Sequence, residues 1–412
     1  MSKIDLSLDI DSLEILSQTV DTKGNIVIEV QSKATDTPCH KCGKTATKRY
    51  GYGPFLTIKH LPLFDKPVYL KIRSVRYQCE HCDDHATTSE QYDWCDRGSK
   101  TSKGLEKYLM RSLIHSTVQD VSRKEGLGYK SIVSILQRHI GEKVDWSDYQ
   151  DLETIGIDEI SLKKGYQDFL TIISAIEQSG RLTIIGILEG RQKKDVKDFF
   201  ESIPKPLIAT TKAVCSDMYD GFVQAAKEVF GSQAVVVDRY HVAKLYRAPL
   251  DKLRIKEMRR LKSEISAEEY SKLEGMMWIL RAHHECLSEA DKSKLTLLYK
   301  YSPALKEAHK CALKLTHIFN TKCNRKVALS KLNRWIQSVE NSDVQCFATF
   351  IKTLKKYKSS ILNYFKARKN SGFVEGLNNK IKVAKRRCYG FFKPESLFQR
   401  MQLDLIGFDM YA

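Results

Sequence analysis

The chain of 412 residues is too long for one ordinary domain, because domains usually span roughly 100 to 200 residues. Hydrophobic residues make up 42% of it, and only 9 Pro and 21 Gly occur, which excludes a disordered or collagen-like chain. The excess of 68 Lys and Arg over 50 Asp and Glu gives a net charge of +18. Such a charge favours a polyanionic partner, and nucleic acid is the first candidate.

The start of the chain is acidic, with Asp5, Asp9 and Glu14, and it lacks the basic and apolar regions of a signal peptide. No apolar run reaches the roughly 18 residues that a membrane span needs. We therefore expect a cytoplasmic protein with no membrane partner. In that compartment the 11 cysteines are better explained by metal ligation than by disulfides.

Two short apolar runs, 13–20 and 26–30, flank a turn and predict a β-hairpin. Two Cys-x-x-Cys pairs follow it, separated by β-rich sequence. The four cysteines are Cys39, Cys42, Cys79 and Cys82. Each pair can present two thiolates to one metal, so the two pairs together predict a structural Zn²⁺ site. One thiol could be replaced by another nearby ligand, and the candidates are His40, His81, His85 and Cys95.

The segment between the cysteine pairs alternates basic and aromatic side chains, which is typical of β-ribbons that contact nucleic acid. These residues include Lys48, Arg49, Tyr50, Tyr52, Phe55, Lys59, Tyr69, Lys71, Arg73, Arg76 and Tyr77. A solvated charged sheet face is the alternative interpretation.

Residues 102–140 change to helical periodicity and fit three short amphipathic helices. Gly126 and Gly128 supply the tight turn that a helix-turn-helix needs between its second and third helices. The helix predicted at 129–140 would be the recognition helix. Its candidate DNA-binding side chains are Lys130, Ser134, Gln137 and Arg138. A helical hairpin used only for packing is the alternative.

Strand patterns begin at residue 154. Three β-branched runs, 154–160, 169–176 and 182–188, should pair antiparallel. Helices and strands then alternate, with a helix at 193–203, a strand at 207–215, a helix at 219–230 and a strand at 234–237. This order predicts an α/β sheet with helices outside it. From about residue 239 to 370 the pattern is helical, with Trp278 and Trp335 expected as core anchors.

Carboxylates stand at the ends of the predicted strands. Asp158 closes the first strand and Asp217 follows the strand at 207–215, and ligands bind at the carboxyl ends of strands in open α/β sheets. A helix from 371 carries Glu375 on a polar face that continues with Asn379, Lys382 and Arg386. We expect a metal-bound phosphate to meet the carboxylate and these DNA-binding side chains together. Each of these residues has a plain structural alternative, such as a helix cap or a solvated face.

These motifs together resemble the ISL3 family of bacterial insertion-sequence transposases over nearly the whole chain. The motifs are the two cysteine pairs, the helix-turn-helix, Gly-Ile-Asp-Glu at 156–159, Cys-Ser-Asp-Met-Tyr at 215–219, Val-Asp-Arg-Tyr-His at 237–241 and Glu-Gly-Leu-Asn-Asn-Lys-Ile-Lys at 375–382. The last motif is the most specific of them.

The resemblance implies a ribonuclease-H-like catalytic domain of the α/β class, interrupted by an all-helical insertion at about 245–360. It also implies a catalytic triad of Asp158, Asp217 and Glu375. Asp238 and His241 match a further motif and are expected to orient the triad, and Asp238 is the main rival of Asp217. The predicted domains are 1–98 for the hairpin and zinc ribbon, 99–145 for the helix-turn-helix and 150–412 for catalysis.

The resemblance further implies a DNA transposase that binds the terminal inverted repeats of its element and catalyses strand cleavage and strand transfer. Three carboxylates can hold two Mg²⁺ or Mn²⁺ ions for an in-line displacement. The expected partners are double-stranded DNA at the element's ends and at the target, and a second copy of the chain. Association with the bacterial nucleoid would follow from DNA binding.

The sequence leaves two other functions to compare with this one. The first is a DNA-binding regulator with a zinc ribbon, a helix-turn-helix and an inert ribonuclease-H-like domain. Metal-dependent nicking of DNA would distinguish the transposase from this regulator. An enzyme with a nucleotide cofactor is excluded at Gly43-Lys44-Thr45, because a phosphate loop needs Gly where Pro38 stands.

Overall fold

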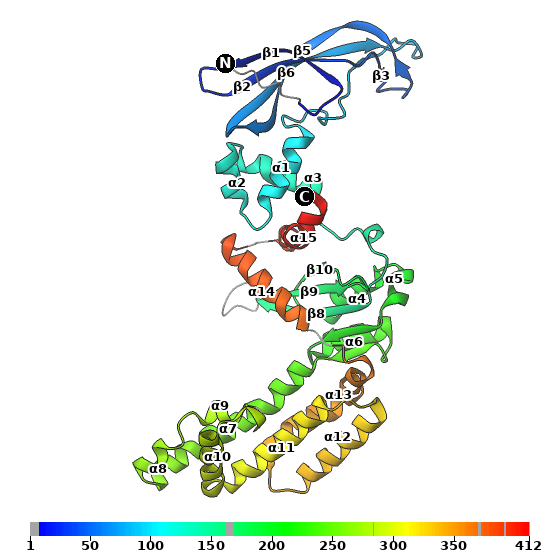
Figure 1. Cartoon of the computed structure of the whole chain (residues 1–412). Helices are drawn as coiled ribbons and strands as arrows, with labels where there is room; N and C mark the ends of the chain where they lie inside the picture. Colours follow the sequence, from blue (N-terminus) through cyan, green and yellow to red (C-terminus); the bar gives the residue numbers. More distant parts are fainter. Residues whose placement is uncertain (1–7, 162–168, 283, 370–371, 391–392, 412) are drawn as a thin grey trace. The chain divides into compact units, whose positions relative to one another are not determined.

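The computed structural model describes residues 8–161, 169–282, 284–369, 372–390 and 393–411 (Figure 1). The chain divides into two compact units. Unit 1 comprises Met1–Glu142 with Gln399–Ala412, and unit 2 comprises Lys143–Phe398. Within the described ranges, no helix has both the length and the apolar character that crossing a membrane requires.

Unit 1 begins with a mixed β-sheet in the order β1-β2-β6-β5, with β7 paired to β6. Its strands are β1 (Leu13–Val20), β2 (Ile26–Ser32), β5 (Lys48–Leu63), β6 (Lys66–Gln78) and β7 (Thr87–Ser89). β1 and β2 pair antiparallel, which confirms the predicted hairpin. The short strands β3 (Thr37–Pro38) and β4 (Thr45–Ala46) form a separate antiparallel pair at the first Cys-x-x-Cys.

The helix-turn-helix of unit 1 consists of α1 (Lys103–Leu113), α2 (Val118–Glu125) and α3 (Tyr129–His139). Gly126 ends α2 with a φ of 57°, a left-handed conformation that glycine adopts without strain, and Gly128 is the N-cap of α3. The predicted glycine turn is therefore confirmed.

The helix-turn-helix core also includes residues from the C-terminal part of α15 (Pro394–Tyr411). Leu403 is fully buried in this core, and the backbone N–H of His115 donates to Asp404 at 2.9 Å. Arg400 is buried beside Asp404 and donates to the carbonyl oxygen of Leu113. The last helix therefore completes the core of a domain formed almost 300 residues earlier in the chain.

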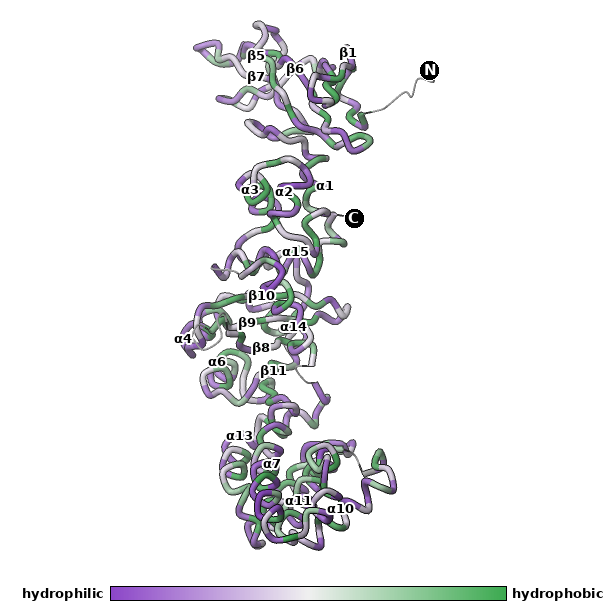
Figure 2. Tube along the Cα trace, turned by 90° about the vertical axis from the view of Figure 1, so that its left-hand side faces the viewer, coloured by the Kyte–Doolittle hydropathy of each residue, from purple (hydrophilic) through white to green (hydrophobic). Residues whose placement is uncertain are grey.

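Unit 2 contains a five-stranded sheet in the order β10-β9-β8-β11-β12. Its strands are β8 (Thr154–Ser161), β9 (Phe169–Ile176), β10 (Leu182–Glu189), β11 (Ala213–Ser216) and β12 (Val235–Val237). The first three strands pair antiparallel as predicted, whereas β8, β11 and β12 run parallel. Green, hydrophobic stretches run through β9 and β10 in Figure 2, in keeping with burial on both faces.

Helices flank this sheet. They are α4 (Lys193–Glu201), α5 (Lys205–Thr210) and α6 (Asp220–Phe230). The strand predicted at 207–215 is wrong in its first half, because residues up to Thr210 belong to α5 and only Ala213–Ser216 form the strand. Pro206 in the first turn of α5 supplies a φ suited to a helix start, which the β-branched pattern obscures.

Helices α7 to α13 follow β12 and precede α14 (Gly372–Arg387), and the described residues between them include no strand. They are α7 (Arg239–Glu264), α8 (Ala267–Ser271), α9 (Met276–Ile279), α10 (Glu289–Tyr301), α11 (Pro303–Asn320), α12 (Arg325–Glu340) and α13 (Ala348–Ala367). They share one hydrophobic core with the sheet. Asn363 of α13 donates to the carbonyl oxygen of Val235 at 2.8 Å and so covers the edge strand β12.

The two tryptophans expected as core anchors differ in their burial. Trp335 is buried and donates from its indole N–H to the carbonyl oxygen of Cys311 at 2.8 Å. The prediction for Trp278 is wrong, because 69% of this side chain is exposed. It follows Gly275, whose φ of 83° turns the chain into the short helix α9, so the indole lies outside the helical core.

The extent of the units differs from the predicted domain ranges. The sequence pattern assigns 150–412 to one domain, whereas unit 2 begins at Lys143 and ends at Phe398. The remainder of α15 belongs to unit 1 because its apolar residues pack on the helix-turn-helix.

Candidate functional site

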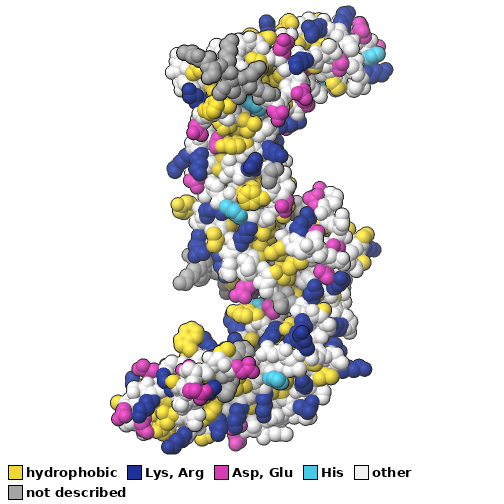
Figure 3. Space-filling view, in the orientation of Figure 1, with side chains coloured by type: hydrophobic (Ala, Val, Ile, Leu, Met, Phe, Trp, Pro, Cys, Tyr) yellow, Lys and Arg dark blue, Asp and Glu magenta, His cyan; other side chains and the backbone are white. Residues whose placement is uncertain are grey.

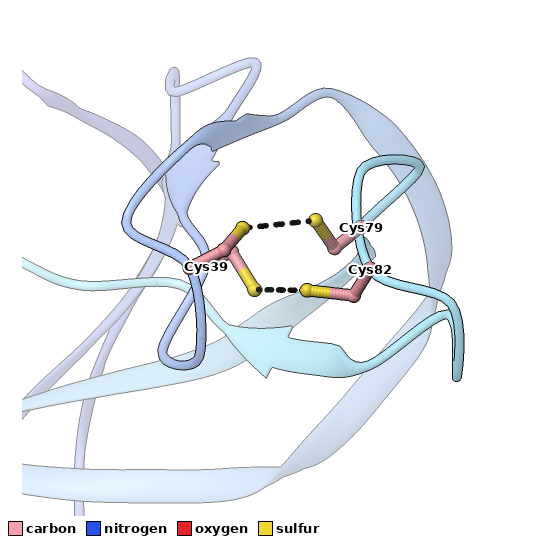
Figure 4. A group of neighbouring side chains, drawn as sticks. Cys39, Cys79 and Cys82 are labelled. Carbon is pink, nitrogen blue, oxygen red and sulfur yellow. Dashed lines mark hydrogen bonds between the residues drawn. The ribbon is translucent and has the colours of Figure 1, made fainter.

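Four thiols meet where the β3–β4 pair lies near the end of β6. The Sγ atoms of all four cysteines lie within 4.8 Å of one another, with 3.8 Å between Cys39 and Cys82 and 3.6 Å between Cys42 and Cys79 (Figure 4). Backbone N–H groups of Cys42 and Lys41 lower the pKa of Cys39 to about 6, which favours the thiolate. Four thiolates at such separations form the ligand set of a tetrahedral structural zinc site.

Three of the four alternative zinc ligands, Cys95, His40 and His85, have other partners. The thiol of Cys95 donates to the carbonyl oxygen of Thr101 at 3.5 Å and packs in the core of the β-sheet. His40 shares a hydrogen bond of 2.9 Å with the hydroxyl of Thr88, and His85 faces a backbone carbonyl. The geometry therefore supports a site of four cysteines, and the sequence alone could not make this choice.

Basic and aromatic side chains pair on the β5–β6 hairpin. The ammonium of Lys71 lies 4.5 Å from the ring centre of Phe55, and the guanidinium of Arg73 lies 5.2 Å from that of Tyr52. Tyr52 and Phe55 remain about half exposed, at 55% and 49%. The predicted alternation therefore produces exposed cation–π pairs on one hairpin.

The exposed face of α3 carries the predicted DNA-binding residues of the recognition helix. The side chains of Lys130, Ser134 and Gln137 are exposed. Arg138 is exposed as well, but its guanidinium donates to the buried carboxylate of Glu106 at 2.6 Å. Burial opposes ionisation of Glu106, yet hydrogen bonds from His139 and Thr101 and the charge of Arg138 hold its pKa at about 2. The ion pair of Arg138 with Glu106 therefore joins α3 to α1.

Three aspartates of unit 2 lie level with one another across adjacent parallel strands. Cys215 of β11 pairs with Gly156 of β8, so Asp217, two residues further on, stands beside Asp158. Ser216 pairs with Val237 of β12, so Asp238 stands beside Asp217 on its other side. The prediction that Asp158 closes its strand is wrong, because β8 continues to Ser161. The parallel strands β11 and β12 do end level with Asp158, and the carboxyl ends of parallel strands are where ligands bind in open α/β sheets.

The carboxyl group of Asp158 has a raised pKa. Burial raises its pKa, and the nearby charge of Asp217 acts in the same direction. The backbone N–H of Glu159, the charge of His241 and the amide of Asn378 act in the opposite direction. A carboxyl group in this environment gains from a nearby cation, because a cation stabilises its charged form.

α14 lies directly against β8. An added Cβ at Gly156 would come within 2.3 Å of Val374 and 2.8 Å of Phe373, so only glycine permits this approach. Asn378 then donates from Nδ2 to Oδ2 of Asp158 at 2.6 Å, and Lys385 donates to the carbonyl oxygen of Ser161 at 3.1 Å. The helix therefore runs alongside the whole second half of the strand.

Glu375, Asn379, Lys382 and Arg386 are exposed along α14. Glu375 lines a cavity of about 340 Å³ together with Asp238, Arg239 and Tyr240 at the start of α7. The carboxylate of Asp238 caps α7 by accepting from the N–H of Tyr240 at 3.0 Å. Asp217 likewise accepts from the N–H of Tyr219 at 3.0 Å.

The three predicted catalytic carboxylates are not gathered as tightly as the cysteines. Among the described residues, the four thiols are the only group of three or more metal-binding side chains with ligand atoms within 4.8 Å of one another. Asp158 and Asp217 are neighbours across the sheet, and Glu375 lies on the helix that packs over β8.

Asn378 is a site residue that the sequence prediction leaves out in favour of its neighbour Asn379. It is 6% exposed, and its Oδ1 has no hydrogen-bond partner in the described structure. Its position three residues after Glu375, on the same side of a helix, is a signal that could have identified it.

Comparisons with known sequences agree with the order of these parts. The transposase model of the ISL3 family matches residues 155–401, the helix-turn-helix model of that family matches 90–140, and a zinc-finger model of related transposases matches 36–82. The transposase for insertion sequence element IS1001 of Bordetella parapertussis is 26% identical over 370 residues, covering 90% of this chain and 89% of the relative.

A second relative is more distant. The transposase for insertion sequence element IS1557 of Mycobacterium tuberculosis (strain ATCC 25618 / H37Rv) is 23% identical over 394 residues, covering 90% of this chain and 86% of that protein. The matched transposase model alone covers more than half of the chain. The chain therefore belongs to the ISL3 family of transposases, with the zinc ribbon, the helix-turn-helix and the DDE domain of that family.

Proposed function

We propose that the protein moves an insertion sequence by binding its terminal inverted repeats, cleaving the DNA strands there and joining them to target DNA. The catalytic carboxylates in this proposal are Asp158, Asp217 and Glu375. The observation that carries it is the level row of aspartates at the carboxyl edge of the sheet, with α14 packed across β8 beside them.

We propose that unit 2 has a ribonuclease-H-like sheet, interrupted by the helices α7 to α13. Three antiparallel strands followed by two parallel strands, in the order β10-β9-β8-β11-β12, support this assignment. The first acid then stands on the central strand β8, and the second stands directly after the neighbouring strand β11.

The donor atoms of the site suit Mg²⁺ or Mn²⁺, which prefer oxygen ligands. Asp158, Asp217 and Glu375 would hold these ions through their carboxylates. Oδ1 of Asn378, which has no hydrogen-bond partner among the described residues, is a further oxygen beside Asp158. When bound, two such ions would activate the attacking oxygen and stabilise the leaving oxygen of an in-line displacement.

The residues around the acids act as supports in this proposal. Asn378 fixes one carboxylate oxygen of Asp158, which leaves its orientation defined before substrate arrives. Asp238 holds the start of α7 and so fixes the position of His241, whose charge acts on Asp158. The exposed side chains of Asn379, Lys382 and Arg386 are proposed to bind the DNA backbone.

DNA ends are proposed to be recognised by unit 1. Lys130, Ser134 and Gln137 on α3 are exposed and able to reach base edges or phosphates in a major groove. Arg138 would join them only by leaving Glu106. Because two ends must be cut together, we propose that two copies of the chain assemble on DNA.

The test is cleavage of a duplex that carries the element's end, read from the DNA flanking the gene, in Mg²⁺ or Mn²⁺. Wild type should cut the 3′ end specifically, and Asp217→Asn and Glu375→Gln should bind the duplex without cutting it. Asp220→Asn is the matched control, because the carboxylate of Asp220 is taken up by Tyr357 and Lys356.

Two results would change the proposal. Cleavage that survives in Asp217→Asn but is lost in Asp238→Asn would transfer the role of second acid to Asp238. Tight binding of the end without cleavage in either metal would support a DNA-binding regulator with an inert catalytic domain.

A further inference from the structure

A series of cavities follows α7 away from the catalytic carboxylates. The first, of about 340 Å³, contains Glu375 and shares Tyr246 and Arg247 with a second of about 40 Å³. The second shares Arg247 and Arg281 with a third of about 20 Å³, which shares Arg254 with a fourth of about 270 Å³. Neighbouring cavities share lining residues and so follow one another along α7, with the two larger ones at the ends; we call this row of cavities the groove.

Arginines line this groove at regular intervals. Arg239, Arg247 and Arg254 are each separated by about two turns of α7, so they lie along one face of the helix over about 22 Å. Arg281 adds a fourth guanidinium from the segment that follows α9. Figure 3 also shows Lys and Arg side chains spread over this helical part of the chain.

The charge of the groove is only partly neutralised. Asp251 pairs with both Arg254 and Arg281, at 2.8 and 3.6 Å. Arg239 donates to the neutral amide of Asn320, and Arg247 pairs with no carboxylate in the described part of the chain. Since arginine binds phosphate oxygens through two parallel N–H groups, this row fits a chain of phosphates.

An exposed aromatic ring marks the far end of the groove. Trp278 lines the fourth cavity beside Met277 and Tyr270, and 69% of its surface is exposed. By contrast, Trp94 and Trp335 are buried at 7% and 4%. An indole that is left in solvent beside arginines offers a stacking surface to any base, whatever its sequence.

We infer that one DNA strand of the bound end follows this groove, with its phosphates on the arginine face of α7 and one base stacked on Trp278. This inference rests on the proposed function, because it takes the carboxylates at Asp158, Asp217 and Glu375 as the place of cleavage. The arginine row from Arg239 to Arg254 covers about 22 Å, which corresponds to about six to seven nucleotides at about 3.4 Å per nucleotide of duplex.

The first arm of the test measures the affinity of the full chain for the end duplex at several salt concentrations. Arg247→Gln should lower the slope of log Kd against log salt concentration by about 1, because one phosphate contact is lost. Arg259→Gln is the matched control, since Arg259 is an exposed arginine of the same helix that lines none of these cavities. Trp278→Ala should weaken binding about 5-fold or more, and Trp278→Phe should restore part of the loss.

The second arm locates the base. 5-Iododeoxyuridine, placed at successive positions from the cleaved phosphate, should cross-link to Trp278 at one defined position, beyond the nucleotides that contact the arginine row. Equal salt slopes for Arg247→Gln and Arg259→Gln, together with cross-linking at no position, would overturn the inference. A wild-type chain that shows the expected slopes and cross-link but never cleaves would instead refute the proposed activity and leave the groove as a DNA-binding surface.

Discussion

Asn378 of α14 donates a hydrogen bond of 2.6 Å to Asp158 of β8, and 220 residues separate the two in the chain. The bond joins the helix that carries Glu375 to the strand that carries Asp158. Because the helices α7 to α13 lie between these two elements in sequence, their packing must return α14 to the sheet before the two proposed catalytic acids can act on one substrate.

The contact depends on Gly156, where an added Cβ would come within 2.3 Å of Val374. Gly156→Ala should push α14 away from β8 and lower the cleavage rate at least about 100-fold, since small displacements of catalytic groups are that costly. Gly376→Ala is the control, because nothing lies within 4 Å of a Cβ there and alanine favours a helix by roughly 1 kcal/mol. Cleavage assays and thermal unfolding of both variants check this, and equal activities would contradict it.

Asp158→Asn should stabilise the protein without metal while it abolishes cleavage. Burial raises the pKa of Asp158 above its ordinary 3.8, so the stability that the group contributes is lost as pH rises from that value through the raised pKa. At neutral pH the amide removes this penalty, and we expect Tm to rise by about 2–4 °C in buffer without Mg²⁺. Adding Mg²⁺ should then raise the Tm of wild type but not of the variant. Thermal scans of both proteins without and with Mg²⁺ test both expectations, and an equal effect of Mg²⁺ on the two proteins would exclude Asp158 as a ligand.

Zinc content should follow the four thiols and not the fifth nearby cysteine. Cys79→Ser should lose the metal and the fold of the ribbon, because Cys79 is fully buried within the cluster. Cys95→Ser should keep about one zinc per chain, since its thiol donates only to backbone oxygens. Metal analysis of the purified variants decides between them, and zinc loss in the Cys95 variant would place that thiol among the ligands.

Glu106→Gln should lower the free energy needed to open α3 away from α1 at neutral pH by on the order of 2–3 kcal/mol. The reason is that the pKa of Glu106 falls from 4.5 to about 2 on folding. A depressed pKa gives stability above pH 4.5 that is lost as pH falls through about 2. The difference in this opening free energy between wild type and Glu106→Gln should therefore become smaller as pH falls from 4.5 to about 2. Hydrogen exchange of the backbone amides of α3, corrected for intrinsic exchange rates, measures the opening free energy. Glu142→Gln is the control, because Glu142 is exposed. A constant difference at every pH would rule out the ionised pair.

The sequence predicted the helices, strands and turns that are determined by residues close together in the chain. Gly126 and Gly128 fix the turn of the helix-turn-helix, and the β-branched runs fix β8, β9 and β10. The cysteine spacing predicted the zinc ligands, but only the fold separates Cys95 from them. The choice between Asp217 and Asp238 stays a prediction, because the sheet register places both at the same edge.

Features set by distant packing could not be predicted in this way. Trp278 has a large apolar side chain of the kind usually found in a core, and its exposure follows from the turn at Gly275. The helix of Lys205–Thr210 depends on a proline in its first turn, against a β-branched pattern. Asn378 reaches Asp158 because Gly156 allows α14 to pack closely against β8, and this contact is not visible in the sequence.

The packing of α15 on the helix-turn-helix has a consequence for synthesis on the ribosome. Leu403 and Tyr411 belong to the core around α1 and α3, so a nascent chain that has emerged only as far as α3 still exposes part of that core. The DNA-binding domain completes its packing after the catalytic unit has been translated. A truncated product that stops before Gln399 would therefore lack part of the hydrophobic core of its helix-turn-helix domain.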